Sequence, residues 1–398
     1  MDENSARPLR ILFLAPQPYF EVRGTPLAVR ALTQALGEQG HAVDLLCYPR
    51  GESIPLPPGA RLLRSLDLPV GRVRPGFSLA KLLLDVPFMA EAKLRMLLGR
   101  YDVVHAVEEA AHIAAPLARL MRLPLVVDVD SSIAEQLEAA RVPFLRPLLA
   151  LVRWLEVYAL RHAAAVITIC NSLSARVRRI APEAAVFQIE DPPLIDSEVI
   201  PSADEIAVLR RSLGLAAGPV ALYSGNFEPY QGVDLLVDAA AQVGEVQFVF
   251  MGGEPDEIDA LRSRAAAVGA AARCTFVGKR PPSELPAFLA LADVLVSPRR
   301  RGQNTPFKIY TYLAAGKPLV ATRIEAHSQL LHDDIAWLAD ATPEALAAGI
   351  RQILSDPAAG RARAERGREF VTREFGPAAF REKVRRAYAH VAEVAWTK

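Results

Sequence analysis

Short apolar segments alternate with longer amphipathic segments along the whole chain. The apolar segments are rich in Val, Ile and Leu and alternate little with polar residues, which is typical of strands buried on both faces of a parallel sheet. The segments between them have helical length and polarity, so the pattern predicts strand–helix–strand units and an α/β fold. The predicted strands are Ile11–Leu14, Val43–Cys47, Val103–His105, Leu125–Val127, Val166–Ile169, Val186–Ile189, Val220–Tyr223, Gln247–Met251, Cys274–Val277, Val294–Ser297 and Leu319–Thr322.

Two domains are expected, because 398 residues exceed what one hydrophobic core normally supports. The polar, proline-containing stretch Glu190–Asp204 interrupts the pattern and is the predicted linker. We therefore expect doubly wound, Rossmann-like domains at residues 1–195 and 196–376, with a last helix at about 377–398 packing back on the first. Two such domains imply a cleft, and ligands of these sheets bind on loops beyond the carboxyl ends of the strands.

The composition excludes several classes of protein. Lys plus Arg (46) nearly balances Asp plus Glu (45), so no overall field indicates a nucleic-acid binder. Cys47, Cys170 and Cys274 are widely spaced, which favours a reducing compartment and predicts no metal site. The acidic N-terminus is unlike a signal peptide, and no apolar run approaches the roughly 20 residues of a membrane span. The expected location is the cytoplasm.

A contact with a membrane surface is a further hypothesis. The segment Pro143–His162 carries Arg146, Arg153, Arg161 and Trp154 among leucines, as an amphipathic helix resting on anionic lipid would. The favoured alternative is a helix packed on the sheet with its polar face in water.

The first candidate loop for chemistry follows the first strand. Gly24 permits close approach of a ligand to the backbone, Thr25 is a predicted N-cap, and Pro26 suits the first helical position. Exposed amides at such a helix start can bind an anion or a hydroxyl. An ordinary strand-to-helix turn is the alternative.

Acidic residues follow the next two strands of the first half. Glu108 and Glu109 come after one strand, and Asp128, Asp130 and Ser131 come at the end of the next. Carboxylates crowded at one sheet edge repel one another unless they bind hydroxyls or cations, so an acceptor site for sugar hydroxyls is predicted. Alternatively, Asp128 or Ser131 only caps the following helix.

The second half has two candidate loops. Gly225 and Asn226 follow its first strand, and His327 near the last strand is a weaker candidate. The basic segment Arg299–Lys308 is the most informative. Asn304 or Thr305 is expected to cap a helix. That helix then begins at Pro306, close to three arginines and Lys308, which predicts a phosphate site; a solvated basic turn is the alternative.

These segments together resemble the retaining glycosyltransferases of family 4, which have the GT-B fold. The resemblance covers nearly the whole chain and includes QALGEQGHAVDLL, YDVVHA, RHAAAVITICNSL, YSGNFEPYQGVDLLVDAA, FVFMGG, TFVGKRPPSELPAFLALADVLVSP and YLAAGKPLVAT. It implies that the second domain binds a nucleotide sugar as substrate and the first binds the acceptor. It also implies that no cofactor or metal is needed and that the anomeric configuration is retained.

Several positions depart from the family pattern. Gln303 and Thr311 stand where the family commonly has two glutamates, and Asn226 and Gln231 stand where it has an arginine and a lysine for the donor diphosphate. Asp130 replaces an acceptor-side histidine. Loss of two cations from a diphosphate site costs several kcal/mol unless compensated, since each charged hydrogen bond contributes roughly 1.5–3 kcal/mol. We expect a donor site rebuilt around Lys308 and the arginines.

The predicted catalytic residues follow from this resemblance. Lys308 and an arginine, assigned to Arg300, would neutralise the departing phosphate, and Asp130 would orient or deprotonate the acceptor hydroxyl. The predicted donor-binding residues are Gly225, Asn226, Gln231, Gly278, Arg299, Gln303, Asn304, Thr305 and Thr311, and the predicted acceptor-binding residues are Gly24, Thr25, Glu108 and Asp130.

Two alternative functions stay open at the level of sequence. One is a non-catalytic binding protein or partner of an active transferase, which the missing glutamates favour. The other keeps the fold but changes the reaction, as in a sugar-nucleotide epimerase or a phosphorolytic enzyme. The sequence disfavours a Rossmann dehydrogenase, because PQPYFEVRG follows the first strand in place of a G-x-G-x-x-G turn.

Overall fold

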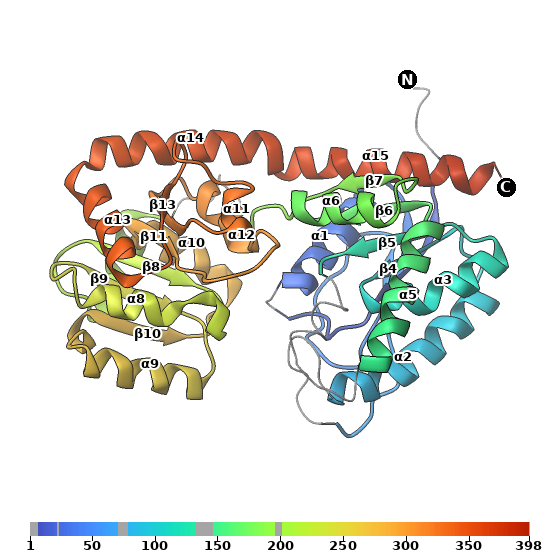
Figure 1. Ribbon diagram of the computed structural model, residues 1–398, viewed down its shortest axis with the longest axis horizontal. Coiled ribbons are helices and arrows are strands. Elements are labelled where there is room, and N and C mark those ends of the chain that lie inside the picture. Colours follow the sequence, from blue (N-terminus) through green and yellow to red (C-terminus); the bar gives the residue numbers. More distant parts are fainter. Residues whose placement is uncertain (1–6, 22–23, 71–78, 132–145, 196–200, 398) are drawn as a thin grey trace. The chain divides into compact units, whose positions relative to one another are not determined.

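The chain forms two compact units in a computed structural model that describes residues 7–21, 24–70, 79–131, 146–195 and 201–397 (Figure 1). Unit 1 comprises Met1–Asp191 and Phe380–Lys398, and unit 2 comprises Pro192–Ala379. The divisions fall within a few residues of the boundaries expected at 195 and 376.

Unit 1 is built on a seven-stranded parallel sheet with the strand order β3-β2-β1-β4-β5-β6-β7. Alternate residues of one strand enter different cores: Leu12 packs in the core on one face of the sheet and Phe13 in the core on the other. The strands are β1 (Arg10–Ala15), β2 (Ala42–Cys47), β3 (Ala60–Arg64), β4 (Val103–Val107), β5 (Leu125–Val129), β6 (Ala165–Thr168) and β7 (Val186–Gln188), and the helices are α1 (Gly24–Glu38), α2 (Leu79–Leu98), α3 (Glu109–Met121), α5 (Arg146–His162), α6 (Asn171–Ile180) and α15 (Pro377–Trp396).

The C-terminal helix α15 belongs to unit 1 for most of its length. Phe380, Val384, Tyr388 and Val391 recur at helical spacing and are buried in the same core as Ile11. The helix therefore covers one face of the unit 1 sheet, as the sequence pattern predicts.

Unit 2 repeats this architecture with a six-stranded parallel sheet of order β10-β9-β8-β11-β12-β13. Two cores again lie on opposite faces, with Tyr223 in one and Leu222 in the other. The strands are β8 (Val220–Ser224), β9 (Gln247–Met251), β10 (Cys274–Gly278), β11 (Val294–Ser297), β12 (Leu319–Thr322) and β13 (Trp337–Ala339); the α-helices are α7 (Ala203–Ser212), α8 (Val233–Ala240), α9 (Pro255–Ala267), α10 (Leu285–Leu291), α11 (Phe307–Ala314), α12 (Glu325–Ser328), α13 (Pro343–Ser355) and α14 (Pro357–Phe375), and short 3-10 turns are η2 (Pro229–Gln231), η3 (Ala271–Arg273) and η4 (Pro282–Glu284).

The strand order identifies where each sheet can bind a ligand. In unit 1 the order reverses between β1 and β4, and in unit 2 it reverses between β8 and β11. Loops at such a switch point diverge and leave a crevice beyond the carboxyl ends of the strands. In unit 2 the diverging loops are the one after β8, which contains Gly225, and the one after β11, which contains Arg299.

Candidate functional site

A row of glycines lines the carboxyl ends of three adjacent strands in unit 2. The Gly225 amide donates to the Met251 carbonyl at 2.9 Å, and the Gly252 amide donates to the Gly278 carbonyl at 2.8 Å. All three glycines have positive φ angles, of 140°, 119° and 67°. A Cβ on Gly252 would lie only 1.9 Å from the Gly225 carbonyl oxygen. Glycine is therefore needed at Gly252 for the close packing of the two backbones, whereas at Gly278 a Cβ would meet only Ile258, at 3.9 Å.

Lys308 brings a cation to this glycine row. Its Nζ lies 3.9 Å from the centre of the Tyr223 ring and 3.4 Å from Gln231 Oε1. A Cβ on Gly225 would come within 2.6 Å of the same Nζ, so the ammonium group lies directly beside the Gly225 backbone. Burial and the nearby Arg299 guanidinium lower the Lys308 pKa well below its ordinary value. An anionic ligand would compensate for both effects.

Arg299 holds the basic loop in place and is buried, with 7% of its surface exposed. Its guanidinium donates to the carbonyls of Arg301 and Asn304 and to Asn304 Oδ1, at 2.9–3.1 Å, and lies over the Tyr230 ring. The side chain of Asn304 is thus engaged with Arg299 and does not cap the helix. Helix α11 begins at Phe307, with Pro306 as N-cap and no side-chain cap, so the predicted capping by Asn304 or Thr305 and the start at Pro306 are wrong.

Arg300 and Arg301, the other arginines of the loop, are both exposed, unlike Arg299. Arg300 is exposed and its guanidinium forms an ion pair with Asp234. The charge of Arg300 is therefore paired within the protein, and Lys308 is the cation that lies beside the glycine row. A catalytic role for Arg300 stays a prediction. Arg301 is exposed.

The two residues in the family's glutamate positions differ in accessibility. Gln303 is exposed and its carbonyl accepts from Gln329 Nε2 at 2.6 Å. Thr311 is 1% exposed, and its hydroxyl oxygen accepts a hydrogen bond from the Leu194 amide at 3.0 Å. Thr311 is therefore part of the packing around α11. Its hydroxyl is not exposed to make the predicted contact with the donor. Thr305 is also buried.

His327 is structural, contrary to its candidacy as a ligand contact. Its Nε2 lies 3.0 Å from Ser297 Oγ, and its Nδ1 lies 2.8 Å from the Thr322 carbonyl oxygen. Burial lowers its pKa to about 3, so the ring is neutral. The Thr322 hydroxyl in turn donates to the Arg299 carbonyl, which fixes the start of the basic loop to the ends of β11 and β12.

A hollow of about 270 Å³ adjoins the third glycine of the row. Gly278, Val277 and Phe276 of β10 form one wall, and Ile258 and Arg262 of α9 are part of the other. The lining is apolar apart from Arg262 and Asp259, which form an ion pair at 3.4 Å, and mainly apolar hollows with a few polar groups are of the kind that receives a flat aromatic ring. Gly278, predicted near the nucleotide base, lies at its edge.

The Gly225→Ala substitution tests the glycine row. We expect nucleotide affinity to fall by about ten-fold, because the added Cβ displaces the Lys308 ammonium and strains a backbone with positive φ. Gly214→Ala is the matched control, since Gly214 also has a positive φ, of 64°, but its Cβ would meet no atom within 4 Å. Calorimetric titration of both variants measures the effect; equal affinities would show that the row does not contact the nucleotide.

Unit 1 gathers carboxyl groups at the carboxyl edge of its sheet. Asp130 follows β5, is 7% exposed, and accepts a hydrogen bond from Thr25 at the start of α1. Its other oxygen, Oδ1, has no hydrogen-bond partner among the described residues. The Ser131 hydroxyl donates to Glu108 Oε1. Helix α1 begins at Gly24, so Thr25 serves Asp130 and is not the predicted N-cap.

Like charge and burial raise the pKa values of these acids. The Asp130 pKa lies well above 3.8, first because the group is buried and then because Asp128 and Glu108 are close. The pKa of Asp191, which follows β7, is also raised, first by burial and then by Asp130 and Asp128. Such groups are poised to take up a proton or to bind a ligand that donates hydrogen bonds. Burial also raises the Glu109 pKa, to about 7, although this carboxylate forms an ion pair with Lys81.

A buried chain of hydrogen bonds links the C-terminal helix α15 to the carboxyl cluster. The Tyr388 hydroxyl of α15 lies 2.7 Å from His105 Nδ1, and His105 Nε2 lies 3.3 Å from Asp128 Oδ2. Burial lowers the His105 pKa to about 3 and raises the Tyr388 pKa well above 10.0. Tyr388 therefore donates to Nδ1, and the neutral imidazole donates from Nε2 to Asp128. The C-terminal helix thus fixes the orientation of the Asp128 carboxyl beside Asp130.

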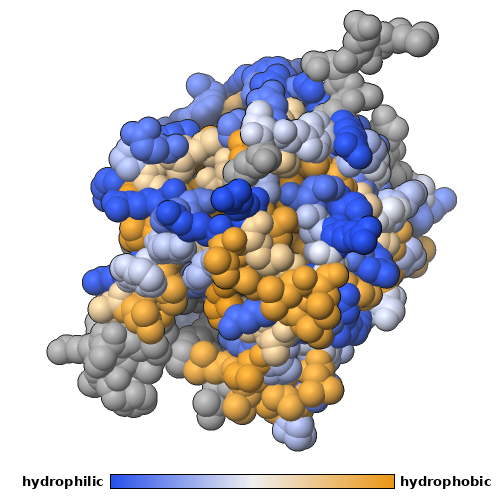
Figure 2. All heavy atoms as spheres, turned by 90° about the vertical axis from the view of Figure 1, so that its right-hand side faces the viewer, coloured by the Kyte–Doolittle hydropathy of each residue, from blue (hydrophilic) through white to orange (hydrophobic). Residues whose placement is uncertain are grey.

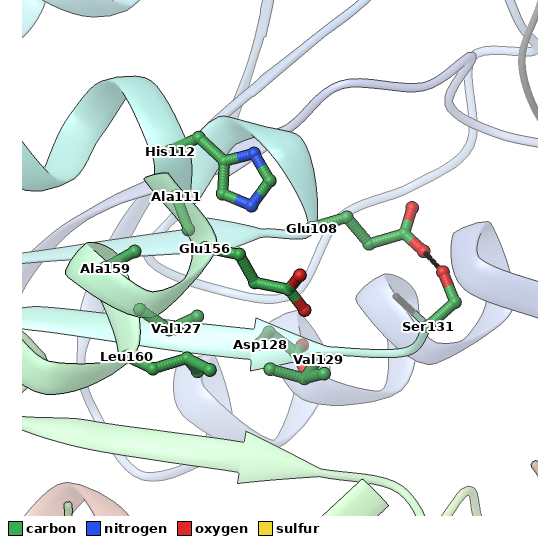
Figure 3. A pocket seen from close by; sticks show the side chains of 10 residues that line it. All are labelled: Glu108, Ala111, His112, Val127, Asp128, Val129, Ser131, Glu156, Ala159 and Leu160. Atoms are coloured by element: carbon green, nitrogen blue, oxygen red, sulfur yellow. Dashed lines mark hydrogen bonds between the residues drawn. The ribbon is translucent and has the colours of Figure 1, made fainter. Parts of the chain in front are cut away.

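Figure 3 shows a small hollow in unit 1, between α3, α5 and the end of β5. Glu108, His112, Asp128 and Glu156 line it, and its volume of about 20 Å³ accommodates about one water molecule. Glu156 accepts from Arg176 at 2.6 Å. The hollow is too small for a sugar, so the acceptor groups of interest are those at the strand ends.

Sequence reasoning missed part of this arrangement. Gly252 belongs to the family-like segment FVFMGG, yet only its place beside Gly225 shows that the two glycines are packed together. Tyr223 was also missed, although it provides the ring beneath Lys308. The signal available was the repeated occurrence of glycine after consecutive predicted strands.

Two family profiles match this chain. A profile described as "Glycosyltransferase Family 4" matches residues 22–187, and one described as "Glycosyl transferases group 1" matches residues 218–356. The α-D-kanosaminyltransferase of Streptomyces kanamyceticus is 28% identical over 253 residues, which are 61% of this chain and 64% of that relative. The chain thus aligns with less than two thirds of that relative's length.

Two solved structures share the fold. Sucrose-phosphate synthase from Thermosynechococcus elongatus superposes with a TM-score of 0.78 at 23% identity, covering 96% of this chain and 98% of that one. Anabaena HepE in complex with UDP-glucose gives a TM-score of 0.75 at 18% identity, covering 96% and 99%. The chain belongs to glycosyltransferase family 4, and its two Rossmann-like units are those of the GT-B fold.

Proposed function

We propose that the protein moves a hexose-type sugar from a nucleoside-diphosphate donor, bound by unit 2, to a hydroxyl acceptor, bound by unit 1, with retention of configuration. The observation that carries the proposal is the position of the Lys308 ammonium beside Gly225, at the switch point of the unit 2 sheet. The name of the kanosaminyltransferase and the UDP-glucose bound to HepE support the same reaction class.

On the donor side, the diphosphate lies on the glycine row and the base enters the hollow beside Gly278. As the bond between the anomeric carbon and the phosphate oxygen breaks, negative charge grows on that oxygen and Lys308 stabilises it. The amide side chains of Asn226 and Gln231 supply neutral hydrogen bonds where the family pattern has cations. Exposed Gln303 supplies one to donor hydroxyls.

On the acceptor side, Asp130 accepts a hydrogen bond from the reacting hydroxyl and takes up its proton as the new glycosidic bond forms. An aspartate with its ordinary pKa is a weak base for this step, but burial and the neighbouring carboxyls raise the Asp130 pKa. Thr25 holds the second oxygen of the carboxyl and so orients the group. Glu108 contacts further hydroxyls of the acceptor.

A second candidate is a binding protein without catalysis. The burial of Thr311 favours it, because a position that holds a glutamate in the family here offers no exposed group to the donor. Both candidates predict nucleotide binding, and only the first predicts turnover.

The experiment is a titration of the purified chain with UDP, GDP and ADP, followed by assays with the matching nucleotide sugars. We expect one nucleotide to bind, and its sugar form to be hydrolysed slowly without an acceptor and transferred faster with sugar alcohols or glycosides. Product NMR reports retention, and assays with EDTA test the predicted independence from metal. Binding without turnover would favour the second candidate, and failure of all nucleotides to bind would refute both.

A further inference from the structure

Helix α2 presents apolar side chains on both of its faces. One face is buried in the unit 1 core through Leu84, Phe88, Ala92 and Met96, which recur every four residues. A helix that packs on a sheet in this way normally exposes polar side chains on the opposite face. The opposite face of α2 instead exposes large apolar residues: Leu82 (43%), Leu83 (45%), Val86 (69%), Leu94 (51%), Leu97 (58%) and Leu98 (75%).

The neighbouring helices extend this apolar surface. Helices α2, α3 and α5 pack on the same face of the unit 1 sheet. Leu120 of α3 is 81% exposed, and Leu151 and Trp154 of α5 are 50% and 57% exposed. Figure 2, which views unit 1 from the right-hand side of Figure 1, shows apolar side chains gathered over one part of this face. A contiguous apolar patch on a protein surface marks an interaction site.

Most of the exposed charges around this patch are basic. On the described residues of the three helices, every exposed Lys, Arg, Asp or Glu is basic: Lys93, Arg119, Arg153 and Arg161. Arg100 and Arg122, in the loops that follow α2 and α3, are also exposed, and so is Asp102, whose carboxylate accepts a hydrogen bond from the Arg10 amide.

The acidic residues of the same helices are less exposed, and each has a partner in the protein. Asp85 accepts a hydrogen bond from the Tyr48 hydroxyl. Glu91, Glu109 and Glu156 form ion pairs with Arg95, Lys81 and Arg176, respectively. The exposed side chains of these three helices are therefore largely apolar and basic.

We propose that the α2–α3–α5 face binds the surface of an anionic membrane. Exposed leucines and a tryptophan on helices that lie flat can enter the boundary between headgroups and acyl chains, and lysines and arginines around them attract anionic headgroups. None of the described helices is both long and apolar enough to cross a membrane, so the contact is a surface contact. The sequence suggested α5 for this role, whereas the structure gives the larger share to α2.

A second copy of the chain fits this face less well. In a symmetric dimer the same patch lies on both subunits, so the basic residues of one copy would face the basic residues of the other. Like charges brought together in an interface disfavour association. An anionic lipid surface complements both the apolar and the basic parts of the face.

Co-sedimentation with vesicles tests the proposal. We expect the full chain to bind vesicles of phosphatidylcholine mixed with phosphatidylglycerol, to bind pure phosphatidylcholine more weakly, and to be released by salt, because the electrostatic part is screened. The triple variant Leu94→Gln/Leu97→Gln/Leu98→Gln should bind at least about ten-fold more weakly, since each buried CH₂ contributes about 0.8 kcal/mol.

The matched control is Val208→Gln/Val268→Gln, which changes exposed apolar residues of unit 2 (56% and 37% exposed) and should bind as the parent chain does. Thermal melting and nucleotide titration show whether each variant is folded. Undiminished vesicle binding by the triple variant would overturn the proposal. So would a parent chain that ignores anionic vesicles and forms a dimer that the triple variant dissociates, because the face would then be a protein interface.

Discussion

Lys308→Met is expected to lower the rate of sugar transfer by about 100- to 1000-fold, the usual effect of removing one group that stabilises charge in a transition state. Methionine keeps most of the length of the side chain over the Tyr223 ring but removes the ammonium beside Gly225. The measurement is kcat with the nucleotide sugar identified by titration. Affinity for the nucleotide sugar should fall less than kcat, because charge on the bridging oxygen develops only as the bond breaks.

Lys317→Met is the control for this substitution. Lys317 is another partly buried lysine of unit 2, and its Nζ donates to the Ala290 carbonyl at 2.8 Å. Burial lowers its pKa as well, but the charged neighbour that acts on Lys317 is Asp293, whereas Arg299 acts on Lys308. If both variants lose activity to the same extent, or if Lys308→Met keeps full activity, Lys308 has no special part in the reaction.

The same lysine predicts a dependence of binding on pH. Burial and Arg299 lower the Lys308 pKa in the unliganded protein, and a bound diphosphate raises it again. Nucleotide binding is then accompanied by proton uptake, and affinity falls as pH rises from the pKa of the unliganded state toward that of the complex. Calorimetry in buffers with different ionisation enthalpies measures the proton uptake, which should be absent in Lys308→Met.

The sequence predicted the parallel strands because their residues are buried on both faces of the sheets. It did not predict β3 or β13, which occupy the outer edges of their sheets. In β3 every residue keeps some contact with solvent, so the uniform apolar signal is missing. Edge position alone does not explain the two misses, because β7 and β10 are also half-buried edge strands and were predicted. The sequence ARLLR of β3 has an arginine at two of its five positions, and β13 is only three residues long, so neither gives the apolar run that identifies a strand.

The candidate site was predictable in location but not in detail. The loops after β8 and β11 were expected from the rule that ligands bind beyond strand ends, and they do flank the switch point. The sequence could not show that Arg299 binds carbonyls within its own loop, or that Arg300 pairs with Asp234, which is 66 residues away. Three adjacent arginines look alike in sequence, and only the folded backbone distinguishes their partners.

Asp130→Asn is expected to reduce transfer by about 100- to 10,000-fold, the range for loss of a general base, while leaving nucleotide binding to unit 2 unchanged. It should also raise the melting temperature by a few degrees near neutral pH. The folded-state pKa of Asp130 lies well above 3.8, so ionisation of this group destabilises the fold as pH rises from 3.8 through that value. The gain in stability should therefore vanish below about pH 4, where aspartic acid is neutral in both states.

Asp44→Asn is the control for Asp130→Asn and is expected to have the opposite effect on stability. Asp44 accepts hydrogen bonds from Arg61 and Tyr101, and although burial opposes them, its pKa is lowered. Its charge stabilises the fold above the ordinary pKa and that stability is lost as pH falls, so the asparagine variant should melt earlier at neutral pH and transfer sugar normally. A residue that costs stability and is needed for activity has a functional role, whereas one that adds stability alone is structural. If Asp130→Asn behaved like Asp44→Asn, the carboxyl cluster would be part of the scaffold and the acceptor site would lie elsewhere in unit 1.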